Sequence, residues 1–270
     1  MSASDLAVRG DLAERVRGDL AERAWAALDE VLDPELDEPV TDLGFVRSLG
    51  VEGGTVRVHL RLPTSFCSPN FAFLMAADAR AALGALDGVD RVIVELDDHH
   101  DSDVINRGLA AGADFVGTFG PEAEEDLDEL RWTFRRKAHT AAMERAITAA
   151  LQDPGAPAGV EAHTLLLRDL PAGRERETLV RRRAALGFDT DDRSPVLVDD
   201  TGAPVPAADA PRRLRQARLV RISMDGNAMF CRGLLRTRYP ESALDQVPRP
   251  GDEQLASIPV TVLPTRRREA

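Results

Sequence analysis

The sequence predicts an α/β (α+β) protein. Its N-terminal domain has a small three-stranded mixed sheet backed by helices, and a long helix and a smaller α+β C-terminal unit follow. Within the first hundred residues, apolar periodicity gives the order helix, strand, strand, helix, strand. A hairpin followed by a helical crossover builds a mixed sheet. The stretch from Pro121 to about Leu151 is charged and helical, and residues 160–240 mix strand-like and helix-like patterns.

The first helix is expected over 19–32, where apolar residues recur at helical spacing. Asp33-Pro34 ends it, because the residue before a proline avoids the α region. An acidic, proline-rich loop to Pro39 follows. Two strands, 45–49 and 55–62, are joined by the turn Gly53-Gly54.

A loop over 63–67 leads into the second helix. Ser68 is expected to cap it and Pro69 to occupy its first position, with Gly88 at its end. Residues 91–96 form the third predicted strand. Beyond it we expect these elements: helices over 102–111, 121–151 and 174–186, strands over 160–167 and 196–198, and a further apolar run over 214–238 with a helix-like part over 228–235.

A length of 270 residues suggests two domains, or one domain with a long extension. The octapeptide VRGDLAER occurs twice in tandem over 8–23 and is too short for a solenoid repeat. The expected organisation is an N-terminal tail or helix with this repeat over 1–21, an α/β domain over 22–104, a helical connector over 105–152, a C-terminal α+β unit over 158–240, and a flexible tail over 241–270.

The net charge of −12 argues against nonspecific nucleic-acid binding, which requires a positive field. Two distant cysteines do not make a disulfide framework. No apolar run approaches the roughly 18 residues that span a bilayer, and the N-terminus has no apolar signal core. We therefore expect a cytoplasmic protein with free thiols and no membrane partner.

Cys67 is the sharpest chemical feature, because it lies between a strand and the start of a helix. The positive end of the helix dipole favours thiolate, so a pKa below the usual value of about 8.5 is expected. The thiolate is the form that binds metal. The alternative is a small buried hydrophobic residue.

The order of Asp33-Pro34-Glu35, Val40-Thr41-Asp42-Leu43-Gly44, Thr64 followed by Cys67, and Val89-Asp90-Arg91-Val92 resembles the SufT/PaaD-like metal–sulfur cluster assembly family. The resemblance covers about residues 22–100. It implies an α/β fold and the assembly or delivery of iron–sulfur clusters, with Cys67 as the reactive cysteine and Asp33 and Glu35 in the acidic loop. Thr64 and Ser68 would support the cysteine loop.

This sequence departs from the family pattern in two places. Ser68 separates Cys67 from Pro69, whereas the family places proline directly after cysteine. This extra residue puts the position of the thiol relative to the loop carboxylates in doubt. The aromatic residue that follows the last strand in the family is replaced by a polar run.

That polar run, over 97–103, contains His99, His100 and Asp101, and imidazoles and carboxylates are good iron or zinc ligands. Adjacent histidines on an extended segment point in opposite directions, so at most one faces a given site. If the third strand lies beside the second, this loop approaches Cys67. The alternative is a solvated turn with Ser102 as a helix cap. Cys231 has apolar neighbours on a predicted helix and is interpreted as a structural thiol.

One cysteine cannot complete the four-thiolate shell of a cluster. A lone thiol fits transient binding of iron or an iron–sulfur cluster, with further ligands from a second subunit of a homodimer, a small thiol or the recipient protein. The expected partners are recipient iron or iron–sulfur proteins and other assembly factors.

Three functions remain open at this point. The first is an assembly or delivery factor, in a narrower version a maturation factor or metallochaperone for an iron-dependent oxygenase. The second is a metalloenzyme that uses Cys67 and His100. The third is a non-catalytic interaction scaffold. We favour the first, which is not an enzyme.

Overall fold

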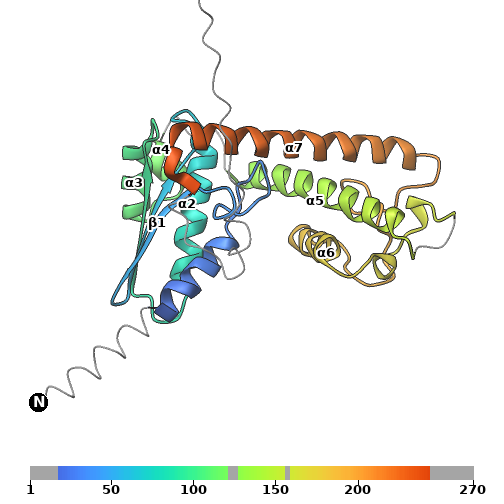
Figure 1. Ribbon diagram of the computed structural model, residues 1–270, viewed down its shortest axis with the longest axis horizontal. Coiled ribbons are helices and arrows are strands. Elements are labelled where there is room, and N and C mark those ends of the chain that lie inside the picture. The colour runs from blue at the N-terminus through green and yellow to red at the C-terminus, as the bar shows by residue number, and fades with distance from the viewer. Residues whose placement is uncertain (1–17, 121–126, 156–158, 244–270) are drawn as a thin grey trace, which may run out of the picture.

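The computed structural model describes residues 18–120, 127–155 and 159–243, and confirms the predicted mixed α/β class. A helix over 18–29 comes first. The further elements are β1 (Val46–Glu52), β2 (Thr55–Arg61), α2 (Pro69–Gly84), β3 (Arg91–Asp97), α3 (Ser102–Ala111), α4 (Phe115–Phe119), α5 (Leu127–Gln152), η2 (Ala162–Thr164), η3 (Leu167–Asp169), α6 (Arg174–Leu186), α7 (Ala210–Arg238) and η4 (Pro240–Ala243). The molecule is elongated, with the sheet at one end and the start of α7 at the other (Figure 1).

The predicted three-stranded mixed sheet is confirmed. Its order is β1-β2-β3, with β1 antiparallel and β3 parallel to the central strand. Leu49 pairs with Val58 in the hairpin, and Leu60 pairs with Leu96 across the parallel pair. Both β2 and β3 therefore end at the same edge of the sheet, which places the loop after Leu62 beside the loop after Asp97.

The first core lies between the sheet and its helices. Alternate residues of β2 are fully buried together with side chains of α2 and of the helix over 18–29: Val56, Val58, Leu60, Leu74, Leu83 and Leu28. Burying one such side chain stabilises the fold by about 1.5–3 kcal/mol. This apolar packing holds the loop between β2 and α2, and with it Cys67, in a defined position.

The second core belongs to a helical unit formed by α5, α6 and α7 with the segment over 159–205. Figure 1 shows α7 running alongside α5, with α6 on the other side of α5. Both long helices reach the first core as well, because Leu127 at the start of α5 and Leu235 near the end of α7 are buried there. The C-terminal unit therefore packs on the N-terminal domain.

Two short strands predicted in the C-terminal unit are not present. Residues 160–167 contain the 3₁₀ turn η2, the start of η3 and an isolated bridge between Leu166 and Pro195, and residues 196–198 contribute only a bridge between Val198 and Pro204. Proline has no N–H for a strand ladder, so neither pairing can extend through these residues. The alternation of apolar residues reflects their burial in the second core.

Other boundaries differ less. The apolar run over 214–238 belongs to one continuous helix, α7, which passes through Gly226 and Gly233. Helix α3 begins at Ser102, so its N-cap is Asp101, and Ser102 instead bonds back to His99. Parts of three predictions lie outside the described residues: 1–17 of the predicted tail over 1–21, 121–126 of the predicted helix over 121–151, and 244–270 of the predicted tail over 241–270. No helix in the described ranges is both long and apolar enough to cross a membrane.

Candidate functional site

Cys67 lies where the sequence places it, in the loop that leads from β2 into α2. Ser68 is the N-cap residue of α2 and Pro69 is at the first helical turn, although the Ser68 side chain makes no capping hydrogen bond. The Thr64 hydroxyl accepts a hydrogen bond from the Phe66 N–H at 3.1 Å, which tightens the loop. The extra residue relative to the family pattern is thus the helix cap, and Cys67 immediately precedes it.

The expected low pKa of Cys67 is wrong. The pKa of this thiol is raised to about 12, chiefly by burial and to a smaller extent by Asp33 and Cys231, although the Ser68 N–H lowers it. Removing a thiolate from water costs more than the dipole of α2 returns. The thiol is therefore protonated in the free protein, and a bound metal ion has to displace its proton.

The loop after β3 is fastened to the cysteine loop, as the parallel pairing of β2 and β3 predicts. The His99 ring is buried, and its Nε2 lies 2.8 Å from the Cys67 carbonyl oxygen. Its Nδ1 accepts the Asp101 N–H at 3.1 Å, so Nε2 carries the proton and donates to the carbonyl. The His100 N–H donates to the Ser65 carbonyl oxygen at 2.9 Å. His99 thus holds the backbone of Cys67 by a hydrogen bond, and both of its ring nitrogens are occupied by backbone groups rather than available to a metal.

The remaining predicted ligands do not converge on the thiol. His100 is exposed, with its ring centroid 6.0 Å from that of Phe66, a side chain that is itself 83% exposed. Asp101 precedes α3 as its N-cap residue. Within residues 18–120, 127–155 and 159–243, no three histidine, cysteine or acidic side chains form a group that could hold a metal ion. The predicted mixed site of Cys67, His99, His100 and Asp101 is therefore not assembled.

Asp33 holds the acidic loop in shape. Its buried carboxylate accepts the backbone N–H groups of Glu35 and Leu36, both at 2.9 Å. Burial raises the pKa of Asp33 to about 6, even though these two hydrogen bonds lower it. Asp33 and Cys67 are close enough for the Asp33 charge to raise the pKa of the thiol.

The rest of the acidic loop receives the helical unit. Glu35 contacts Lys137 of α5 at 3.8 Å and Asn227 of α7 at 3.2 Å. Asp37 makes a two-pronged ion pair with Arg182 of α6, with distances of 3.0 and 2.8 Å. Glu38 pairs with Arg232 of α7. Helices α5, α6 and α7 of the C-terminal unit thus each have a polar contact with this loop.

The end of α7 lies directly against the two loops of the site. Arg238 donates to the Leu62 carbonyl oxygen at 3.1 Å and to the Ser65 hydroxyl at 2.8 Å. The Tyr239 hydroxyl donates to the Asp98 carboxylate at 3.0 Å. These contacts attach the end of α7 to the cysteine loop and to the loop after β3.

Cys231 belongs to this same stretch of α7 and is half-buried against the first core, as Cys67 is. Burial raises the pKa of Cys231, with further contributions from the Asp33 and Glu35 carboxylates. Sequence reasoning assigned Cys231 a structural role and missed its proximity to Cys67. The only sequence signal is helical spacing, because Asn227, Cys231 and Arg238 lie on one face of α7.

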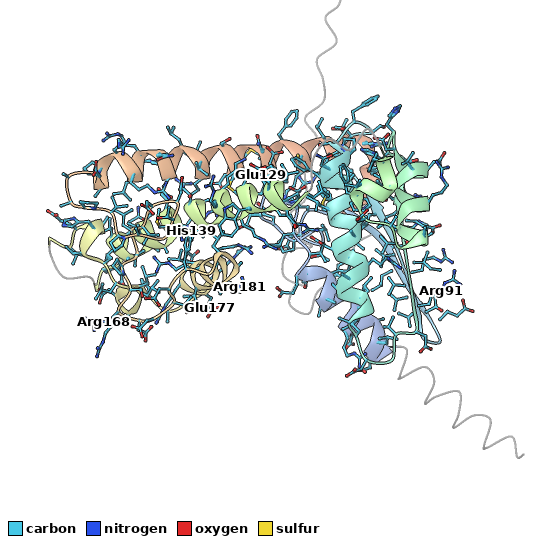
Figure 2. The ribbon with its side chains drawn as sticks, turned by 180° about the vertical axis from the view of Figure 1, so that it is seen from behind. Arg91, Glu129, His139, Arg168, Glu177 and Arg181 are labelled. Carbon is cyan, nitrogen blue, oxygen red and sulfur yellow. The ribbon has the colours of Figure 1, made fainter. Side chains whose placement is uncertain are left out.

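Residues far from these loops pack within the helical unit or lie on the surface. His139 of α5 lies in the interior of the helical unit, whereas Arg91 points outward from the sheet at the other end of the molecule (Figure 2). Arg183 is buried and donates to the carbonyl oxygens of Asp189, Pro195 and Val196. The arginine cluster over 181–183 is therefore used within the fold, and His139 is a packing residue.

Residues 21–96 match the family model described as iron-sulfur cluster assembly protein. The matched segment contains β1, β2, α2, the acidic loop, Cys67 and all of β3 except its last residue, and it ends before His99 and Cys231. No curated protein matches the chain. The family match supports a general role of this domain in iron–sulfur cluster assembly.

Proposed function

We propose that the protein assembles or delivers iron–sulfur clusters, in the manner of SufT/PaaD-like factors, and that Cys67 handles the iron or cluster as cargo. The match of residues 21–96 to the cluster assembly family is the observation that carries this proposal. Cys67 is the only cysteine of the matched segment, and it lies in the loop between β2 and α2. On this proposal the protein works in the cytoplasm as an assembly factor, without turning over a small substrate.

The chemistry of the site suits a cargo that is passed on. A cluster or iron ion needs several thiolate ligands, and Cys67 supplies one of them. The described residues around it provide no group of three ligands that would retain the metal. Because the thiol is protonated when empty, proton uptake favours release of the cargo. Weak, incomplete ligation is what a donor to another protein requires.

Two exposed apolar surfaces support direct contact with partner proteins. Phe66, adjacent to Cys67, projects into solvent beside His100. The outer face of α7 exposes Leu219, Ile222, Met229 and Phe230. Exposed apolar surface of this kind is typical of protein–protein contacts. Recipient iron proteins, including an iron-dependent oxygenase, and other assembly factors are the partners that this proposal implies.

A non-catalytic scaffold is the second candidate. The protonated thiol and the engagement of both His99 nitrogens by backbone groups favour it. In that case the site binds partners without handling metal.

Anaerobic reconstitution with iron and sulfide separates these functions. The parent protein, Cys67→Ser and the neighbouring control Ser68→Ala are compared by absorption spectra and by counting iron and sulfide. We expect a cluster in the parent and in Ser68→Ala, whose side chain makes no capping bond, and loss of the cluster in Cys67→Ser. Absence of iron and sulfide from the parent would favour the non-catalytic scaffold over the cluster assembly factor. Iron binding that is unchanged in Cys67→Ser would show that Cys67 does not handle the iron or cluster.

A further inference from the structure

We infer that Cys231 of α7 is the second thiol of the cargo site, so that Fe²⁺ or a [2Fe–2S] cluster is held between Cys67 and Cys231. This inference rests on the proposed function and deepens it, because the C-terminal extension then contributes a ligand as well as docking. Two thiolates form a soft ligand pair that selects iron–sulfur species and Zn²⁺-like ions over Mg²⁺ or Ca²⁺.

The first support is the anchoring of α7 on both sides of Cys231. Four residues before it, Asn227 donates to the Glu35 carboxylate at 3.2 Å. Seven residues after it, Arg238 donates to the Ser65 hydroxyl at 2.8 Å, two residues from Cys67. Positions four and seven residues apart share one helix face. The Cys231 face of α7 therefore bridges the acidic loop and the cysteine loop.

The second support is the shared surroundings of the two sulfur atoms. Both cysteines are half-buried and pack against the first core, where Ala228 and Leu235 of α7 are fully buried. Both lie within the electrostatic influence of Asp33 and Glu35, and Cys67 also lies within that of Cys231. Arg232, next to Cys231, is held by Glu38 of the same loop. The two thiols therefore lie in the same surroundings, although they are far apart in the sequence.

The third support is the charge balance of a metal bound to two thiols. A divalent ion that displaces both protons leaves a neutral metal–dithiolate unit, which removes the cost of burying the two negative charges. The remaining coordination positions stay open for a recipient protein.

Cobalt(II) titration of the full chain tests this pair without requiring a cluster. Each thiolate bound to cobalt adds a sulfur-to-cobalt charge-transfer band of similar intensity. The parent is therefore expected to show about twice the intensity of Cys67→Ser or Cys231→Ser, and the double variant none. Ser223→Ala, an exposed position of α7 two turns before Cys231, is the control and should match the parent. Equal intensity in the parent and in Cys231→Ser would overturn the inference.

Phenylarsine oxide tests the same proximity on the unmodified protein. Two thiol S–H bonds and the As=O bond break, two As–S bonds form, and one water leaves without a change of oxidation state. We expect one arsenical per native parent chain, bound in a form that withstands excess monothiol. Arsenical that a monothiol removes would overturn the inference. Cobalt and arsenical binding without iron–sulfide reconstitution would support the dithiol site and reject the proposed function. The failure of the inference can therefore be distinguished from the failure of the proposed function.

Discussion

Replacing His139 by leucine should remove a large pH-dependent loss of stability. The His139 ring is 1% exposed, packs edge-on against Phe188 at 5.2 Å between centroids, and leaves its Nε2 without a partner among the described residues. Burial lowers its pKa from 6.5 to about 4, and the charges of Arg183 and Arg213 lower it further, although Asp200 opposes them. The native protein therefore holds this histidine neutral.

The sign and size follow from proton linkage. Between pH 6.5 and pH 4 the unfolded chain binds a proton at His139 that the folded chain refuses, so stability falls as the pH falls through this range. The full loss is about 3 kcal/mol, and about 2 kcal/mol of it is present at pH 5. Asp33 acts in the opposite direction, because its raised pKa of about 6 makes the folded state bind the extra proton as the pH falls from 6 to 3.8.

These two contributions oppose each other in the parent, so the difference in unfolding free energy between parent and variant is the informative quantity. Urea unfolding followed by circular dichroism at pH 7 and pH 5 gives the free energy of unfolding of each protein. His139→Leu should gain about 2 kcal/mol on the parent between pH 7 and pH 5. Met143→Leu, a buried and non-titrating change one turn away on α5, should show a constant difference. A constant difference for His139→Leu as well would refute this account of the helical core.

Three further predictions concern the attachment of α7 and the thiols. Leu235 is 2% exposed in the first core, so Leu235→Ala should lower the free energy of unfolding by about 2–5 kcal/mol. Leu219 is 69% exposed on the same helix, so Leu219→Ala should change it by no more than about 0.5 kcal/mol. Equal effects of the two variants in urea unfolding would show that α7 is not packed on the first core. Arg182→Leu should lower the free energy of unfolding by about 3–5 kcal/mol, because it leaves the buried Asp37 carboxylate without its partner. Adding Asp37→Asn to the same chain should recover part of that loss. Additive effects of the two substitutions would show that the two side chains are not coupled. In a Cys231→Ser protein at pH 8, Cys67 should react with a disulfide reagent more slowly, by on the order of 10-fold or more, than a free cysteine peptide, because burial alone holds its pKa above the usual value. A peptide-like rate would contradict the burial of the thiol.

The N-terminal domain could be predicted from the sequence because its signals are local. The alternation in β2, the Gly53-Gly54 turn and Ser68-Pro69 at the start of α2 each determine structure within a few residues. The mixed sheet then follows from the order of the elements. In the C-terminal unit, Pro195 and Pro204 left only isolated bridges where strands were expected.

The site was harder to predict because its properties are tertiary. The position of Cys67 before α2 follows from sequence, but its raised pKa depends on burial and on Asp33 and Cys231, which come from distant segments. The acidic loop was expected from the resemblance, but the contacts of Asp37 with α6 and of Glu38 with α7 depend on tertiary packing. No local pattern shows that α7 returns to the cysteine loop, so Cys231 was interpreted only as a packing residue.

Cluster transfer tests the central claim most directly. The protein is loaded anaerobically with iron and sulfide and mixed with an apo-ferredoxin in the presence of an iron chelator, and circular dichroism follows formation of the ferredoxin cluster. We expect transfer from the parent and from Ser68→Ala that resists the chelator, with loss of transfer in Cys67→Ser. Transfer at the parent rate from Cys67→Ser, or cluster formation that the chelator abolishes in every protein, would contradict the proposal that Cys67 handles the cluster.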